Sequence, residues 1–175
     1  VQKAGAIFDI TKLDWLNSQH LANLSLQEFK SYLKPFLSEI SIDINNHDNV
    51  DLLIESMRTS ENTLKGIAKS LKPYYEEVSD YNEKAIDKFL DDEGKEILIE
   101  LKELLSNINH WSEDSIDKVL KGYQQDNDCP VPKVNQPIRI ALTGSTKSPS
   151  MGLTLSLFSK EESLNRISNL LSNFT

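Results

Sequence analysis

The sequence predicts an all-α fold, and three observations support this prediction. Apolar residues recur at spacings of three and four along most of the 175 residues, which is the period of one face of an α-helix. Serine-led capping boxes open two of these periodic runs, and no stretch of useful length alternates apolar and polar residues as a half-buried strand would. Hydrophobic residues make up 38% and charged residues 26% of the chain, a composition typical of globular proteins.

Four helices are predicted in the first part of the chain. The first covers residues 12–24, and the second opens at a capping box in which the Ser25 and Glu28 side chains each bond the other residue's backbone N–H. We expect a kink or break at Pro35, because proline lacks a backbone N–H and its ring clashes with the preceding turn. A polar loop and two further helices are predicted at 41–49, 50–58 and 63–71.

The middle of the chain contains the longest periodic run, residues 83–105. It is interrupted at residues 91–94, where we expect two helices to meet. A further helix is predicted to begin at Ser112. Residues 124–134 contain two prolines and several Asn and Asp residues, which predicts a loop.

Two more helices are predicted after this loop. A short one at 136–142 ends at Gly144, whose freedom to adopt a positive φ suits a helix C-cap. The last one opens at a second capping box, formed by Ser159 and Glu162, and continues toward the C-terminus.

The charge of the chain argues against non-specific binding of nucleic acid. The formal net charge is −8, and an acidic surface repels phosphates. The charge is uneven, however, because residues 121–175 hold six basic and four acidic groups. Contacts with an anionic partner are therefore expected to concentrate in the C-terminal third.

The chain carries no obvious catalytic or metal-binding pattern. It has no glycine-rich phosphate loop, and its three histidines and single cysteine do not have zinc-ligand spacing. We therefore expect no catalytic residue and no metal site. Cys129 has no partner for an internal disulfide, which favours the reducing cytoplasm, and no apolar run reaches the roughly 20 residues of a membrane helix. The start at Val1 without methionine indicates a fragment of a longer protein.

Residues 2–17, which read Q-K-A-G-A-I-F-D-I-T-K-L-D-W-L-N, are the first of two informative segments. They resemble a segment of bacterial-type glutamyl-tRNA synthetases, S-K-A-G-A-x-F-D-x-x-K-L-D-W-L-N, that follows the lysine-rich loop of the catalytic domain. We expect Trp15 to pack the connecting helix against a neighbour rather than to contact RNA.

Residues 136–151, Q-P-I-R-I-A-L-T-G-S-T-K-S-P-S-M, are the second. They resemble the stretch Q-P-[LI]-R-x-A-L-T-G-x-x-x-[ST]-P-G-[LI], which meets the anticodon loop in the same family. The resemblance implies four anticodon-binding residues: Arg139, Ser148, Pro149 and Met151. An arginine guanidinium can stack on a splayed base or bond two acceptors. The alternative for this arginine is a surface salt bridge with a nearby acid.

The chain departs from the family pattern in two places. Ser150 replaces the usual glycine, and Gly152 stands where a large apolar residue is common, so the loop backbone is expected to differ. Family members that accept only tRNA-Glu often carry an arginine before a T-L-K segment, and this arginine reads the third anticodon base. Here the aligned residue is Ser60, and Arg58 lies two residues earlier. Loss of the arginine is compatible with a relaxed synthetase that also charges tRNA-Gln; the alternative is a slipped alignment.

The resemblance implies an all-helical anticodon-binding region of a class I glutamyl-tRNA synthetase. We expect three parts: the tail of a connecting region at 1–24 and two helical subdomains at 25–80 and 81–175. The parent enzyme would attach glutamate to tRNA with ATP and Mg²⁺ bound in its catalytic domain. This chain would supply recognition of tRNA-Glu, as a cytoplasmic monomer that binds neither DNA nor membranes.

A competing hypothesis is a helical protein–protein interaction module without RNA binding. This class of protein would explain the acidic surface better than an RNA-binding domain does. The two hypotheses differ in one measurable property, which is salt-dependent affinity for tRNA.

Overall fold

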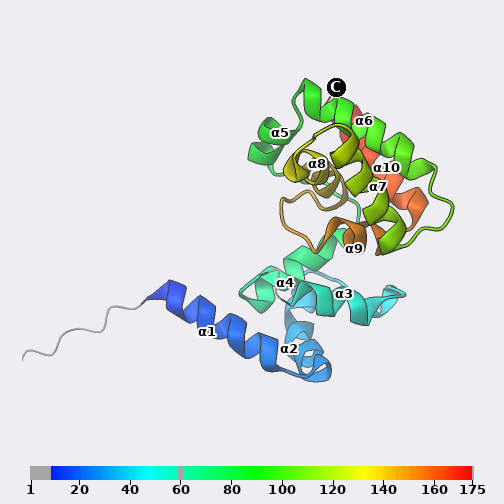
Figure 1. The fold of residues 1–175 in the computed structure, drawn as a ribbon. Coiled ribbons are helices and arrows are strands. Elements are labelled where there is room, and N and C mark those ends of the chain that lie inside the picture. The colour runs from blue at the N-terminus through cyan, green and yellow to red at the C-terminus, as the bar shows by residue number, and fades with distance from the viewer. Residues whose placement is uncertain (1–8, 59–60, 175) are drawn as a thin grey trace, which may run out of the picture. The chain divides into compact units, whose positions relative to one another are not determined.

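The computed structural model describes residues 9–58 and 61–174. Over these residues the secondary structure consists of α-helices and two short 3₁₀ turns, without strands (Figure 1). The all-α prediction is confirmed. The chain forms two compact units that divide between Leu71 and Lys72.

The first unit is built around a small apolar core. Helix α4 packs against α2 and α3, and the 3₁₀ turn η1 packs against α3. The bounds are α1 Ile10–Asn23, α2 Leu26–Glu39, η1 Ile44–Asn46, α3 Val50–Met57 and α4 Leu64–Leu71. The largest side chains that become fully buried are Phe29, Leu33, Leu53, Ile54, Met57, Ile67 and Leu71. Their spacing of three and four residues along each helix is the pattern that predicted these helices.

Helix α2 continues through Pro35, so the predicted break does not occur. Proline removes one backbone hydrogen bond and crowds the preceding turn. The buried residues Phe29, Leu33 and Leu37 lie on both sides of it along the chain and share one face. Burying this face stabilises the helix by more than the proline costs, since each such side chain contributes roughly 1.5–3 kcal/mol.

The second unit is organised around α8, which packs against α5, α6, α7, α9, α10 and the 3₁₀ turn η2. The bounds are η2 Lys72–Tyr74, α5 Glu83–Phe89, α6 Asp92–Ser106, α7 Glu113–Asp126, α8 Val131–Thr143, α9 Met151–Ser156 and α10 Lys160–Asn173. Ile138, Ile140, Ala141 and Leu142 of α8 are completely buried. The predicted functional stretch is thus also the central helix of its unit.

The second unit begins earlier along the chain than the predicted boundary at residue 80. Tyr74 stacks on Phe158 with ring centroids 4.9 Å apart. The Arg166 guanidinium donates to the Glu76 carbonyl at 2.9 Å. These contacts hold residues 72–80 to α10 and the turn before it.

Two helices of the second unit differ from the sequence prediction. Helix α8 begins at Val131 rather than near 136, with Pro130 as its N-cap and Pro132 in its first turn, where no backbone N–H needs an intrahelical partner. Helix α9 was not predicted, because six residues are too short to show a helical period.

Three further local predictions have outcomes in the structure. The Ser25–Glu28 capping box forms completely. Ser159 accepts the Glu162 N–H at 3.1 Å, but the Glu162 carboxylate binds Arg166 Nε instead of completing the second box. Trp15 is 58% exposed, so the expected packing against a neighbour is not present in the described part of the chain.

Candidate nucleic-acid interface

The candidate interface begins where α8 ends at Gly144. This residue has a φ of +66°, as the sequence predicted, and its N–H donates to the Ile140 carbonyl at 2.8 Å. Its own carbonyl accepts the Asn82 N–H at 2.9 Å. A Cβ atom here would clash with the Asp80 carbonyl oxygen. Glycine therefore ends the helix and fixes the start of the loop 144–150 against a neighbouring segment.

Arg139 holds this loop from the side of α8. Its Nε donates to Ser148 Oγ at 2.8 Å, and its Nη2 donates to the Pro149 carbonyl at 3.3 Å. In the described part of the chain, Nη1 donates no hydrogen bond. The side chain is half-buried, and burial lowers its pKa from the ordinary arginine value, although an arginine remains charged at neutral pH. The alternative of a salt bridge is not what the described residues show, since Arg139 bonds a hydroxyl and a carbonyl.

Thr154 on α9 holds the same loop from beneath. Its side chain has no exposed surface. Its Oγ1 lies 2.9 Å from Ser148 Oγ and 3.3 Å from the Pro149 carbonyl oxygen. Sequence reasoning missed this residue, because nothing in its surroundings along the chain distinguishes it from any other polar residue of a helix.

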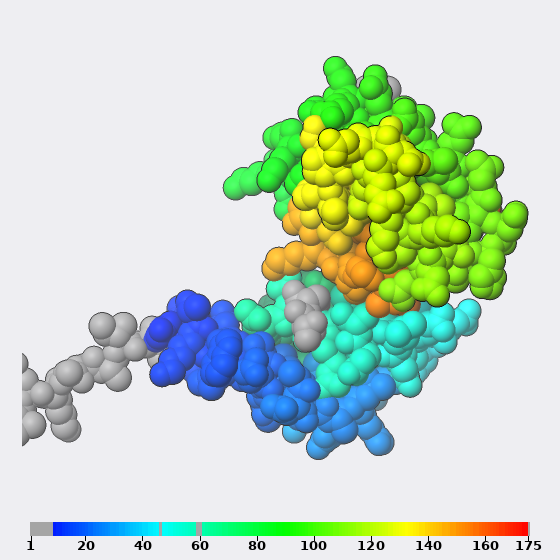
Figure 2. All heavy atoms as spheres, viewed as in Figure 1, coloured from blue at the N-terminus to red at the C-terminus, as the bar shows by residue number. Residues whose placement is uncertain are grey.

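The other predicted loop residues have different environments. Ser148 and Pro149 are half-buried, so each keeps some surface for a ligand. Met151 is only 3% exposed and packs in the core beneath the loop. In the space-filling view, the orange atoms of the loop and α9 lie at the surface of the second unit beside the yellow atoms of α8 (Figure 2).

The structure explains both departures from the family pattern in this loop. Ser150 caps α9 by accepting the Leu153 N–H at 3.4 Å, and its hydroxyl donates to Glu113 Oε1 at 3.1 Å. Its φ is −50°, so no glycine is required there. At Gly152, a Cβ atom would clash with Asp117 Oδ1, so the missing side chain allows α9 to approach α7 closely.

Arg58 belongs to the first unit and is 9% exposed. Its Nη1 bonds both carboxylate oxygens of Glu55 at 2.9 Å. Its Nη2 donates to the carbonyls of Leu21, Ala22 and Leu24 at the end of α1, and the guanidinium lies over the Phe29 ring. Arg58 thus caps the C-terminus of α1. Ser60 lies outside the described residues.

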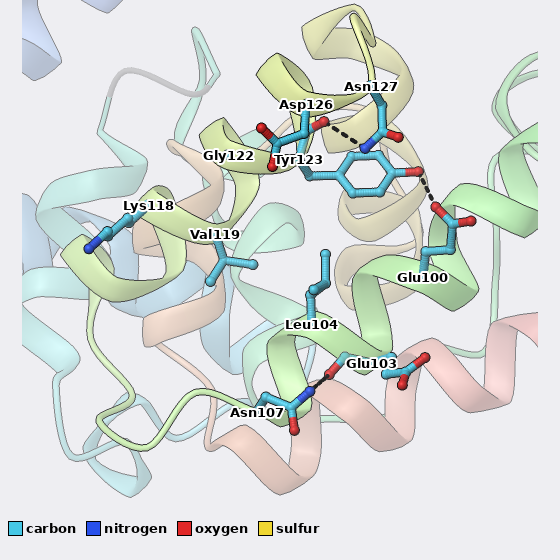
Figure 3. A pocket seen from close by; sticks show the side chains of 10 residues that line it. All are labelled: Glu100, Glu103, Leu104, Asn107, Lys118, Val119, Gly122, Tyr123, Asp126 and Asn127. Carbon is cyan, nitrogen blue, oxygen red and sulfur yellow. Dashed lines mark hydrogen bonds between the residues drawn. The ribbon is translucent and has the colours of Figure 1, made fainter.

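A groove of about 570 Å³ between α6 and α7 is a separate feature of the second unit (Figure 3). Leu104 and Val119 face it, and the Tyr123 hydroxyl donates to Glu100 Oε2 at 2.6 Å at one end. Three acidic residues line it: Glu100, Glu103 and Asp126. A phosphate backbone would be repelled here, so the groove is unsuited to RNA.

Neither a metal centre nor a membrane-spanning helix is found among the described residues. No group of three or more His, Cys, Asp or Glu side chains is arranged there to hold a metal ion. None of the described helices combines the length and apolar character needed to cross a bilayer.

The family described as anticodon binding domain matches residues 27–171, which is most of the chain. The chain belongs to the anticodon binding domain family. It is 34% identical over 168 residues to the glutamate–tRNA ligase of Myxococcus xanthus, covering 95% of this chain and 35% of that protein. It is 32% identical over 172 residues to a glutamate–tRNA ligase of Thermus thermophilus, covering 98% of this chain and 36% of that protein.

Solved structures agree with this assignment. The glutamate–tRNA synthetase of Elizabethkingia anophelis superposes with a TM-score of 0.72 at 25% identity, over 98% of this anticodon binding domain and 33% of that chain. The glutamate–tRNA ligase of Elizabethkingia meningosepticum superposes with a TM-score of 0.78 at 24% identity. The superposition covers 100% of this chain and 34% of that chain. The predicted resemblance to the anticodon-binding region of glutamyl-tRNA synthetases is confirmed. The chain spans about a third of the length of the curated relatives that it matches.

Proposed function

We propose that this anticodon binding domain recognises the anticodon loop of tRNA as part of a glutamate–tRNA ligase. The parent protein would use ATP and Mg²⁺, bound in a catalytic region, to attach glutamate to tRNA in the cytoplasm. The anticodon binding domain would orient the tRNA and select it by its anticodon. The relatives named glutamate–tRNA ligase support this proposal.

The observation that carries the proposal is the arrangement of Arg139 with Ser148 and Pro149. The loop binds Nε and Nη2 of the guanidinium, while Nη1 makes no hydrogen bond within the described part of the chain. Anticodon bases are single-stranded, so they can stack on a planar cation and offer their Watson–Crick edges to nearby polar groups. A guanidinium whose orientation is already set loses little entropy when it meets a base.

The predicted residues take different roles in this proposal. Arg139 stacks on or bonds a base, Ser148 and Pro149 form the contact surface beside it, and Met151 supports that surface from the core. In the first unit, Arg58 acts by positioning the end of α1, since its donors already bind Glu55 and three carbonyls. By the resemblance to the family, the position of Ser60 would be the one that reads the third anticodon base.

The proposed partner is tRNA-Glu. An arginine in the position of Ser60 would supply a pair of donors that favours C over G at the third base, and a serine supplies only one hydroxyl. We therefore also propose that tRNA-Gln is accepted, because its anticodon differs from that of tRNA-Glu at this third base.

The test measures the binding of full-length tRNA-Glu and tRNA-Gln transcripts across a salt series, with fluorescence anisotropy as the readout. Arg139→Ala is expected to weaken binding by about 1–3 kcal/mol, the contribution of one base contact. Arg139→Lys keeps the charge and loses the planar fork, so it should recover little affinity. Lys121→Ala, an exposed cation paired with Asp117 on α7, serves as the charge-matched control and should leave affinity unchanged.

The salt dependence separates this function from the competing one. A single-stranded RNA site weakens with the logarithm of salt concentration at a slope of roughly −0.7 per phosphate contacted. The acidic groove between α6 and α7 is the observation that favours a protein-binding module instead. Absence of tRNA binding, in this chain and in the intact parent protein, would overturn the first function and leave the second as the better explanation.

A further inference from the structure

We infer that Thr154 is a specificity-determining positioning residue, which sets whether Ser148 offers a nucleobase a hydrogen-bond donor or an acceptor. The inference rests on the proposed function, because it concerns the same loop. Thr154 itself is fully buried and cannot touch RNA. It acts through Ser148, which is half-buried and keeps exposed surface.

The two hydroxyls share a small set of partners. Ser148 Oγ accepts from Arg139 Nε at 2.8 Å, lies 2.9 Å from Thr154 Oγ1, and lies 3.1 Å from the Pro149 carbonyl oxygen. Thr154 Oγ1 lies 3.3 Å from the same carbonyl oxygen. Each hydroxyl has one proton and two lone pairs. The two protons can therefore be placed in more than one consistent way, and two of these arrangements differ in what Ser148 offers a ligand.

In the first arrangement, Thr154 donates to Ser148. The Ser148 oxygen then has both lone pairs occupied, by Arg139 and by Thr154, and its proton points either to the Pro149 carbonyl or to a ligand. A base that approaches Ser148 meets a donor and must present an acceptor.

In the second arrangement, Thr154 donates to the Pro149 carbonyl and Ser148 donates to Thr154. One lone pair of Ser148 is then left for a ligand. A base that approaches meets an acceptor and must present an N–H. The position of one buried proton thus changes which base edges fit.

Because Thr154 is buried, protein atoms rather than water determine where its hydroxyl proton points. A buried hydroxyl without a partner costs about 1–3 kcal/mol, so the Thr154 proton stays on a bond to either Ser148 or the Pro149 carbonyl. The Arg139 bond to Ser148 occupies one lone pair in both arrangements. Together, Arg139 and Thr154 restrict the hydrogen bonds that Ser148 can offer before any RNA is present.

The test compares Thr154→Val, which removes the hydroxyl at nearly constant shape, with Thr154→Ser, which retains it. Dissociation constants are measured for tRNA-Glu transcripts with each anticodon base changed in turn, at fixed salt, and expressed as ratios to the unchanged transcript. We expect Thr154→Val to reduce at least one ratio by about tenfold, as loss of one directed hydrogen bond implies. The salt dependence should not change, because no phosphate contact is removed.

Thr154→Ser is expected to restore that ratio to within about twofold of the original chain. In a Ser148→Ala background, Thr154→Val should have no further effect on it, because the group that Thr154 orients is gone. If Thr154→Val fails to fold, Thr154→Ala measures the same loss with a smaller side chain. Unchanged ratios in a folded hydroxyl-free variant would overturn the inference. Ratios near one in the original chain would instead overturn the proposed function, so the two failures are distinguishable.

Discussion

Gly144 determines through its backbone where the loop 144–150 begins. Its left-handed conformation lets α8 end after Thr143, and the chain then turns toward Ser148. The neighbouring Asp80 carbonyl occupies the space that a side chain would need. The left-handed φ and the lack of space for a side chain both require glycine at this position. Both also direct the loop toward Arg139.

Gly144→Ala is therefore expected to destabilise the protein by at least about 2 kcal/mol, the combined effect of the left-handed conformation and the steric conflict. Urea unfolding measures this change. Gly122→Ala is the matched control: it lies inside α7, and a Cβ atom there would meet nothing within 4 Å. The control should stabilise the helix by roughly 0.5–1 kcal/mol. A Gly144→Ala variant as stable as the original chain would contradict this account of the loop.

Individual residues also show where sequence reasoning reaches its limit. Gly144 was predicted because a helix end leaves a recognisable pattern, and the capping box at Ser25 was predicted for the same reason. The capping role of Ser150 and the buried hydroxyl of Thr154 depend on contacts between α7, α9 and the loop. No spacing along the chain encodes such contacts.

At the scale of the element, the end of α1 depends on a residue from another helix. Its last carbonyls have no partners within the helix, as at every helix C-terminus. Arg58, the C-cap of α3, donates to the carbonyls of Leu21 and Ala22 and to that of Leu24, the C-cap of α1. It also brings a positive charge to the negative end of the helix dipole. Helix α1 is thereby fixed to the first unit, although its exposed face carries Ile10, Leu13 and Leu16.

Arg58→Met is expected to lower the stability of the first unit by about 2 kcal/mol, because it leaves helix-end carbonyls without donors. Hydrogen exchange should become faster at the last turn of α1 and change less in the core of α2. Arg58→Lys retains the charge but not the planar guanidinium fork. Its exchange rate at the last turn of α1 should lie between those of the original chain and of Arg58→Met. Equal exchange rates at the end of α1 in all three proteins would show that Arg58 does not fix this helix.

The helices that sequence reasoning placed well are those with a long apolar period and a clear start. Helix α2 carries both signals, and its core face survives the proline within it. Helix α8 was placed too late because two prolines indicated a loop, whereas in the structure they stand at its beginning. Proline is compatible both with a loop and with the first turn of a helix. The packing of α8 against α6 and α10 therefore decides between these two structures.

At the scale of the whole molecule, the second unit contains tyrosines whose ionisation opposes folding. Burial raises the pKa of Tyr74, against smaller opposing effects of Thr154, Arg139 and Arg166. Burial and the bond to Glu100 raise the pKa of Tyr123. A tyrosine in an unfolded chain ionises near pH 10. Between that value and the raised values, the folded state binds more protons than the unfolded state.

The free energy of unfolding should therefore be unaffected by these tyrosines below about pH 10 and should fall as the pH rises above it, by up to about 1.4 kcal/mol per pH unit for each group. Urea unfolding between about pH 8 and pH 11 checks this. Tyr74→Phe should reduce the decline. Tyr32→Phe, at a side chain 54% exposed in the first unit, is the control. A decline that Tyr74→Phe leaves unchanged would contradict the assignment to Tyr74.

The acidic helices α6 and α7 have a consequence for how quickly a partner is found. Residues 92–126 carry nine acidic and four basic groups, whereas residues 127–150, which include Arg139, carry one acidic and three basic groups. A polyanion therefore gains little from long-range attraction, and electrostatic steering cannot bring its association near the diffusion limit. A polyanion encounters this surface less often than it would encounter a basic RNA-binding surface. Encounters that begin at α6 and α7 end sooner, because like charges repel each other. Under the proposed function, the time that a tRNA stays bound, rather than the rate at which it arrives, would separate a correct anticodon from an incorrect one.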